Sequence, residues 1–82
     1  MQVRKRDGRV LDFDMTRIAK AIYGANIDAK RGWELEDTIR IAKEIIATLP
    51  NGGTIYTIKE IQDAIEKYLF QNDEREVFKY FT

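Results

Sequence analysis

The sequence feature that most constrains the fold is Asp7-Gly8, which stands between two short runs of residues with strand character. Glycine accepts the positive φ angle that a tight turn needs, so a dipeptide of this kind predicts a β-hairpin. We expect the two strands at about residues 2–6 and 10–13. The chain is therefore predicted to begin with a pair of antiparallel strands.

Three consecutive cations, Arg4, Lys5 and Arg6, end the first of these strands. One interpretation is a solvated edge strand, because charge blocks pairing with another chain. The next helix favours a second interpretation, since Arg17 would lie in its first turn, where the helix dipole disfavours a cation. An anion held between the hairpin and that helix start would account for both features, because backbone N–H groups and cations both bind anions. Nucleotide phosphate is the natural candidate.

Apolar residues at three- and four-residue spacing predict four helices. We expect them at about residues 15–23 or 15–25, 35–49, 58–70 and 74–82. Asp14 would cap the first helix, and Thr57 with Glu60 matches the capping box at the start of the third. The bundle core is expected at eight positions: Ile18, Ile22, Ile39, Ala42, Ile46, Ile61, Ile65 and Leu69.

Residues typical of turns separate these helices. Residues 50–53 are expected to end the second helix, residues 54–56 to add a short third strand, and residues 71–73 to break the third helix. Trp33 is interpreted as a core anchor at the start of the second helix rather than a ligand platform, because large aromatic side chains usually serve packing. Four residues are expected to end the first helix and form the loop after it: Gly24, Asn26, Asp28 and Gly32.

Composition excludes several classes of function. The 82 residues suit one small domain with one core, and 44% hydrophobic residues are enough for it to fold. The 14 basic and 14 acidic residues balance, whereas a dedicated duplex-DNA binder normally has a basic excess. The chain has no Cys and no His, so we expect no catalytic residue and no metal site. No apolar run approaches membrane-spanning length, and a cytoplasmic domain without membrane or direct nucleic-acid contact is expected.

Two motifs resemble the signatures of the ATP-cone family. The first combines Val3-x-Lys5-Arg6-Asp7-Gly8 with Phe13-Asp14 and Arg17-Ile18, and the second is Ile55-x-Thr57-x-x-Glu60-Ile61-Gln62-Asp63. The resemblance covers nearly the whole chain, and the first motif is the more specific. It implies a mainly α, α+β fold, in which a small N-terminal hairpin or three-stranded lid caps a four-helix bundle. It also implies a regulator that binds ATP or dATP and performs no reaction.

The resemblance implies a context as well. The family occurs at the N-terminus of ribonucleotide reductases, where ATP favours and dATP opposes activity, and in a bacterial repressor of reductase genes behind a zinc ribbon. That ribbon needs cysteines, so the reductase context is favoured. We expect residues 1–82 to be one regulatory domain of a longer parent, with the parent's catalytic domain and subunits as partners and Mg²⁺ accompanying the nucleotide. Two alternatives stay open: a degenerate cone that only mediates subunit contacts, including contacts with a second copy, and the ATP-cone of the transcriptional repressor of reductase genes.

Carried over position by position, the resemblance implies eight nucleotide contacts: Val3, Lys5, Arg6, Asp14, Arg17, Ile18, Thr57 and Gln62. The two apolar residues would flank the adenine, and the three cations would face the phosphates. Asp14 would stand near the nucleotide at the helix start, with Thr57 and Gln62 on the phosphate and sugar side. Each position also has a purely structural interpretation, as a core residue or a helix cap. Lys5 and Arg6 raise a geometric difficulty, because successive strand residues point to opposite faces.

Leu11 departs from the family pattern, which has Glu there, placed to read the adenine amino group. Leucine cannot accept a hydrogen bond, so we expect weak adenine selectivity unless Asp12 supplies the carboxylate. Ile22 is a further candidate at the same site. The family also continues with a further helical stretch, so the fourth helix is expected to be short and the pocket open on one side.

Overall fold

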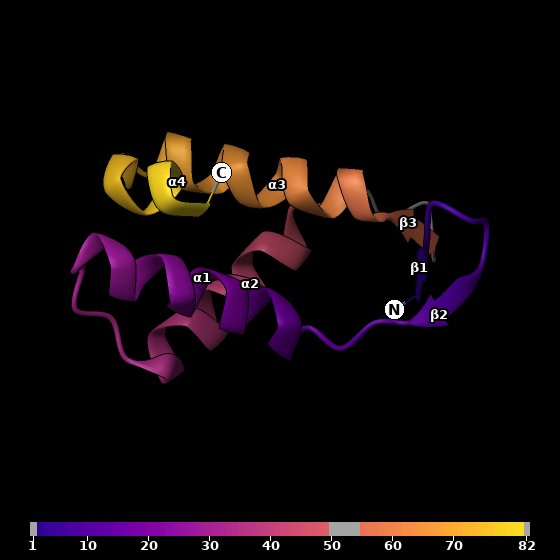
Figure 1. Ribbon diagram of the computed structural model, residues 1–82, viewed down its shortest axis with the longest axis horizontal. Helices are drawn as coiled ribbons and strands as arrows, with labels where there is room; N and C mark the ends of the chain where they lie inside the picture. The colour runs from indigo at the N-terminus through magenta and orange to yellow at the C-terminus, as the bar shows by residue number, and fades with distance from the viewer. Residues whose placement is uncertain (1, 50–54, 82) are drawn as a thin grey trace.

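The computed structural model describes residues 2–49 and 55–81, which form a small sheet beside four helices (Figure 1). The sheet lies at one end of an elongated molecule of 36 × 21 × 20 Å, and two layers of helices make up the rest. This arrangement confirms the predicted α+β fold. Within the described residues, no helix has the length and apolar character needed to cross a bilayer. The elements are β1 (Gln2–Arg4), β2 (Val10–Asp12), α1 (Thr16–Ala29), α2 (Leu35–Ala47), β3 (Ile55–Thr57), α3 (Ile58–Gln71) and α4 (Arg75–Phe81).

The sheet has the order β2-β1-β3, with β1 antiparallel to β2 and parallel to β3. Its hairpin turn occupies residues 5–9, where the Lys5 N–H donates to the Arg9 carbonyl (2.8 Å) and the Gly8 N–H donates to the Lys5 carbonyl (2.9 Å). Gly8 has the positive φ expected of it, 90°. Because the turn is five residues long, β1 ends two residues earlier than predicted. The predicted third strand is confirmed, although Thr54 lies outside the described residues.

α1 extends at least four residues beyond its predicted end, because Asn26 is a buried helical residue rather than part of a loop. The Asn26 amide donates to the carbonyl oxygens of Tyr23 (3.3 Å) and Trp33 (3.1 Å), and its Oδ1 accepts the Trp33 N–H (2.8 Å). These bonds satisfy a buried polar group and tie the following loop back to the helix. The helix ends at Ala29, its C-cap residue Lys30 has a φ of 54°, and Gly32 follows with a φ of 86°.

Capping boxes begin both α2 and α3. The Thr57 hydroxyl accepts the Glu60 N–H (3.0 Å) and the Glu60 carboxylate accepts the Thr57 N–H (3.0 Å), as predicted. Sequence reasoning missed the reciprocal bond at α2, where the Glu34 N–H donates to the Asp37 carboxylate (2.9 Å). The stop predicted for α2 at residues 50–53 lies outside the described residues.

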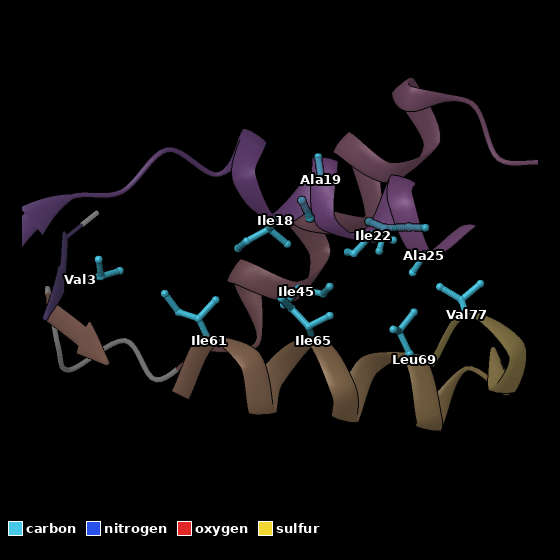
Figure 2. Packing of buried hydrophobic residues seen from close by; sticks show 12 residues of the cluster. Val3, Ile18, Ala19, Ile22, Ala25, Ile45, Ile61, Ile65, Leu69 and Val77 are labelled. Atoms are coloured by element: carbon cyan, nitrogen blue, oxygen red, sulfur yellow. The ribbon is translucent and has the colours of Figure 1, made fainter. Parts of the chain in front are cut away.

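The core runs along the facing surfaces of the helices and reaches Val3 on β1 (Figure 2). Six of the eight predicted core residues are buried, but Ile39 and Ile46 are only half-buried. The buried face of α2 is rotated from the predicted one and centres on Ile41, Ala42 and Ile45. The apolar stripe of α2 is wide enough to permit either face, so contact with the neighbouring helices decides between them.

Candidate functional site

A basic groove lies between the hairpin turn and the start of α3. The parallel pairing of β1 with β3 sets Arg4 opposite Thr57, so the turn residues after Arg4 come beside the first turn of α3. The groove has a volume of about 410 Å³. Its walls are Arg4, Lys5, Arg6, Thr57, Ile58, Lys59 and Gln62.

The cations of the hairpin are available to a ligand. Among the described residues, Arg4, Lys5 and Arg6 form no ion pair, and the Arg4 guanidinium contacts only the Gly8 carbonyl, at 3.4 Å. The carboxylate of the turn, Asp7, instead accepts the Arg9 N–H (3.1 Å) and pairs with the Arg9 side chain (2.6 Å). These bonds, the backbone one first, lower the pKa of Asp7. The acid nearest to the groove in the chain therefore forms its ion pair with Arg9 and not with a groove cation, although the charge of Lys5 also contributes to its lowered pKa.

The geometric difficulty with Lys5 and Arg6 disappears in the structure. Side chains alternate between the two faces only within a strand, and β1 ends at Arg4. Lys5 and Arg6 belong to the turn, and both line the basic groove. Adjacent cations can therefore serve one ligand.

The helix that accompanies these cations is α3, not α1 as the sequence suggested. The groove takes three of its walls from the N-terminal cap and first turn of α3 and none from α1. The reason is topological, because β3 leads directly into α3, whereas residues 13–15 carry the chain away from the sheet before α1 begins (Figure 1). A helix N-terminus favours an anion, and Lys59 adds a further cation, paired with Asp63 at 3.2 Å.

An apolar pocket of about 180 Å³ lies between the N-terminal halves of α1 and α3. Ile18 forms part of its buried wall, and Figure 2 shows this side chain facing Ile61 and Ile65 across the interior. Among the described residues of this lining, Arg17 has the one charged side chain. The described residues that line the pocket are Phe13, Arg17, Ile18, Ala21, Ile58, Ile61, Gln62, Ile65 and Phe81.

The basic groove and the apolar pocket adjoin, because Ile58 and Gln62 line both. Ile58 is 44% exposed, although it stands in the first turn of a helix whose other isoleucines are buried. The Gln62 amide donates to the Glu66 carboxylate at 3.3 Å, which leaves its carbonyl oxygen as an acceptor. A polar group thus stands at the junction of a cationic surface and an apolar one.

The other predicted site residues line neither cavity. Val3 and Ile22 are buried in the core, and Val3 points from β1 towards the start of α3 (Figure 2). Asp14 is exposed and accepts the Thr16 N–H (2.9 Å), which is the main cause of its lowered pKa. α1 begins at Thr16, one residue later than predicted, and its cap residue is Met15. Asp14 lies one residue before the cap and binds the first N–H of the helix, so its predicted position as the N-cap is wrong. Its contact with a nucleotide stays a prediction, as do those of Val3 and Ile22.

Leu11 and Asp12 lie on β2, outside both cavities. Leu11 pairs directly with Val3, so the two side chains share one face of the sheet, and that face looks towards the helices. Asp12 is the next residue along the strand and belongs to the opposite face. Leu11 is therefore better placed than Asp12 to approach a ligand between the sheet and the helices.

Sequence reasoning did not assign several lining residues to the site. Arg4 belongs to the noted run of cations, and Phe13 belongs to the first motif, so both had a local signal. Lys59 and Ile58 had only their place beside the capping box. Phe81 had none, because its arrival at the pocket depends on how α4 folds back against α1.

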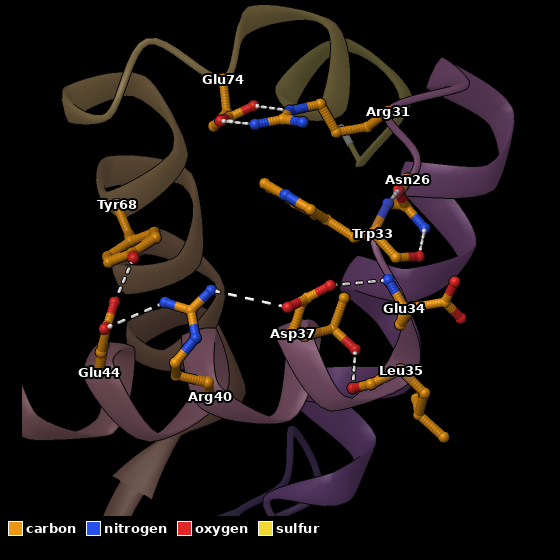
Figure 3. Close-up of polar contacts among 11 residues, drawn as sticks. Asn26, Arg31, Trp33, Glu34, Leu35, Asp37, Arg40, Glu44, Tyr68 and Glu74 are labelled. Atoms are coloured by element: carbon orange, nitrogen blue, oxygen red, sulfur yellow. Dashed lines mark hydrogen bonds and ion pairs between the residues drawn. The ribbon is translucent and has the colours of Figure 1, made fainter.

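The opposite end of the molecule has cations of another kind (Figure 3). Arg31 donates to both oxygens of Glu74 (2.9 and 3.2 Å) and stacks 4.9 Å from the Trp33 ring. Arg40 lies between Asp37 (3.9 Å) and Glu44 (3.6 Å). Arg31 joins the α1–α2 loop to the residue just before α4, and Arg40 forms ion pairs along α2. Both cations therefore already have carboxylate partners within the chain. Trp33 is half-buried against the core, as predicted.

Comparison with known proteins identifies the chain's relatives. The ATP cone domain family matches residues 1–82. A vitamin B12-dependent ribonucleoside-diphosphate reductase of Thermoplasma acidophilum is 35% identical over 68 residues, which is 83% of this chain and 9% of the relative. The alpha subunits of ribonucleoside-diphosphate reductase from Chlamydia muridarum and Chlamydia trachomatis are 29% and 31% identical, over 95% and 89% of this chain. The chain spans only 8–9% of the length of these three relatives.

The match over every residue agrees with the architecture, a four-helix bundle with a three-stranded sheet at its N-terminus. It agrees also with the motifs at the hairpin and at the start of α3, which the fold brings together at the basic groove. This chain belongs to the ATP-cone family.

Proposed function

We propose that this chain is a regulatory domain that binds ATP or dATP, together with Mg²⁺, and performs no reaction itself. The observation that carries the proposal is the junction of the basic groove with the apolar pocket at Ile58 and Gln62. A nucleoside triphosphate has the same division, because a sugar joins its flat base to a polyanionic tail. The family to which the chain belongs supports the same ligand class.

The triphosphate lies in the basic groove. Arg4, Lys5 and Arg6 supply charge-assisted hydrogen bonds, and the first N–H groups of α3 add donors. Since these three cations have no carboxylate partner among the described residues, phosphate does not have to displace one. In the described part of the chain no group of three or more acidic residues is arranged to hold a metal ion, and Mg²⁺ commonly binds through phosphate oxygens and water. The metal therefore arrives with the phosphates.

The base lies in the apolar pocket and the sugar at the junction. Ile18 and Ile61 offer apolar surface to a purine ring, and Gln62 offers its amide to the ribose. Arg17 lies on the same wall and adds positive charge where the base meets the phosphates. This arrangement gives Ile18, Arg17, Thr57 and Gln62 the kinds of contact that the family resemblance implies for them.

The relatives place the domain in a larger assembly. All three are ribonucleoside-diphosphate reductases or their alpha subunits, so we infer that the chain regulates a reductase in the cytoplasm. Its partners are then the catalytic domain and the other subunits of that enzyme.

Calorimetric titration with ATP and with dATP, each with and without Mg²⁺, tests the proposal. We expect saturable binding of both nucleotides, weaker binding without the metal, and displacement of ATP by inorganic tripolyphosphate. If neither ATP nor dATP binds at concentrations up to the millimolar range typical of weak sites, the proposal is contradicted. The remaining function would then be subunit contact without an effector.

A further inference from the structure

We propose that Phe81, on α4, is a base-contact residue, and that binding of the nucleotide base and docking of α4 therefore strengthen each other. The inference deepens the proposed function and rests on it. It concerns how an effector held by α1 and α3 acts on a third helix.

Three helices line the apolar pocket. α1 and α3 supply most of its walls, and Phe81 adds a half-buried aromatic side chain from α4. α4 contributes no wall to the basic groove. The base of a bound nucleotide therefore contacts α4, and its phosphates do not.

α4 is held in place by contacts with the rest of the fold. A helix of seven residues is too short to be stable alone, so its position depends on its packing. Val77 is fully buried, the Phe78 ring meets Phe70 edge-on at 6.3 Å, and Glu74 just before α4 binds Arg31 through two hydrogen bonds. Figure 3 shows that last anchor, at the end of the molecule away from the sheet. Phe81 belongs to the last turn of α4, next to the pocket.

Base binding and docking of α4 are thermodynamically linked. An aromatic ring against a purine adds a stacking or edge contact, which exists only while α4 is docked. Any ligand that binds the docked state more tightly must shift α4 towards that state, and docking must raise the affinity by the same factor. Inorganic tripolyphosphate fills only the groove and has no such effect. The docking of α4 therefore responds to the base of the nucleotide and not to its phosphates.

Substitution of Phe81 tests the contact directly. Phe81→Ala should weaken ATP about five- to tenfold, as expected for a lost aromatic contact, and leave tripolyphosphate affinity within about twofold. Phe81→Leu should keep part of the affinity for ATP. Tyr80→Ala is the matched control, because Tyr80 is the neighbouring aromatic residue, is 50% exposed and does not line the pocket. Unchanged tripolyphosphate binding also shows that each variant is folded at the groove.

Amide hydrogen exchange tests the coupling. ATP should slow exchange in the last turn of α4, and tripolyphosphate at equal saturation should not. Arg31→Gln, which removes the distant anchor without touching the pocket, should weaken ATP and spare tripolyphosphate. If ATP binds but Phe81→Ala binds it equally well and α4 exchanges at the same rate, the inference is wrong while the proposed function stands. If neither ATP nor tripolyphosphate binds, the proposed function fails first.

Discussion

The two ends of this small bundle use the same type of side chain in opposite ways. At the sheet end, Lys5 and Arg6 line a groove and form no ion pair among the described residues. At the other end, Arg31 and Arg40 are joined to the carboxylates of Glu74, Asp37 and Glu44. The chain has no net charge, so this difference lies in the arrangement of charge rather than in its amount. The paired cations make contacts within the fold, and the unpaired ones are available to an anion.

Loss of the groove cations should have the largest effect on binding. Lys5→Ala with Arg6→Ala should weaken ATP by about 1.5–3 kcal/mol for each residue, because each removes a charge-assisted hydrogen bond. The free energy of unfolding should hardly change. Arg40→Ala with Lys43→Ala is the matched control, since it removes two exposed cations outside both cavities. Calorimetry gives the affinities, and equal binding by the groove variant and the parent would exclude this groove as the phosphate site.

The core that connects the two ends should dominate stability instead. Ile65 is buried on α3 beneath the pocket, and Ile65→Ala should lower the free energy of unfolding by about 2–5 kcal/mol. Ile27→Ala is the control, because Ile27 is 57% exposed and its loss should change stability by less than about 0.5 kcal/mol. Chemical unfolding measures both. A loss below about 1 kcal/mol at Ile65 would mean that the buried helix faces are misassigned.

Leu11 should govern a smaller effect, on the choice of base. The parent should discriminate poorly between ATP and GTP, since an apolar contact does not read the purine 6-position. Leu11→Glu should raise the preference for ATP by up to about 1–2 kcal/mol, through a hydrogen bond to the amino group. Asp12→Ala should leave the preference unchanged, because its side chain belongs to the other face of the sheet. Paired titrations decide this, and strong rejection of GTP by all three proteins would show that the base is read elsewhere.

The smallest effect concerns pH and belongs to the end without the groove. Burial, and then the hydrogen bond to Glu44, raise the pKa of Tyr68 to about 12. A pKa raised in the folded state gives a contribution that is complete below pH 10 and is lost as the pH rises towards 12. The stability difference between the parent and Tyr68→Phe should therefore shrink between these two values. Urea unfolding at a series of pH values checks this, and a constant difference would contradict it.

Local signals in the sequence predicted more of the fold than of the site. Asp7-Gly8 and the Thr57–Glu60 box specify their turn and cap through backbone chemistry, and both were confirmed. Asn26 misled, because the same amide that caps a turn in one setting can satisfy a loop carbonyl from within a helix in another. What settles such a case is a contact with Trp33, seven residues away.

The site depends even more on contacts that no local pattern specifies. The cations of the hairpin were recognised as a unit from the sequence, but their place beside the first turn of α3 depends on the parallel pairing of β1 with β3. Phe81 reaches the pocket only because α4 folds back on α1. Residues far apart in the chain meet through sheet order and helix packing, which the periodicity of single segments does not determine.

The most direct test of the difference between the two ends is a map of amide chemical shifts in the isotopically labelled chain during titration with Mg²⁺ and ATP. We expect saturable changes in the amide shifts of the hairpin turn, of the start of α3 and around Ile18, and almost no change at the amides of Arg31, Trp33 and Arg40. Changes centred on those last three residues would place the ligand at the wrong end of the molecule. Saturable shift changes at Arg31, Trp33 and Arg40, without any change at the hairpin turn, would contradict the assignment of the basic groove as the phosphate site.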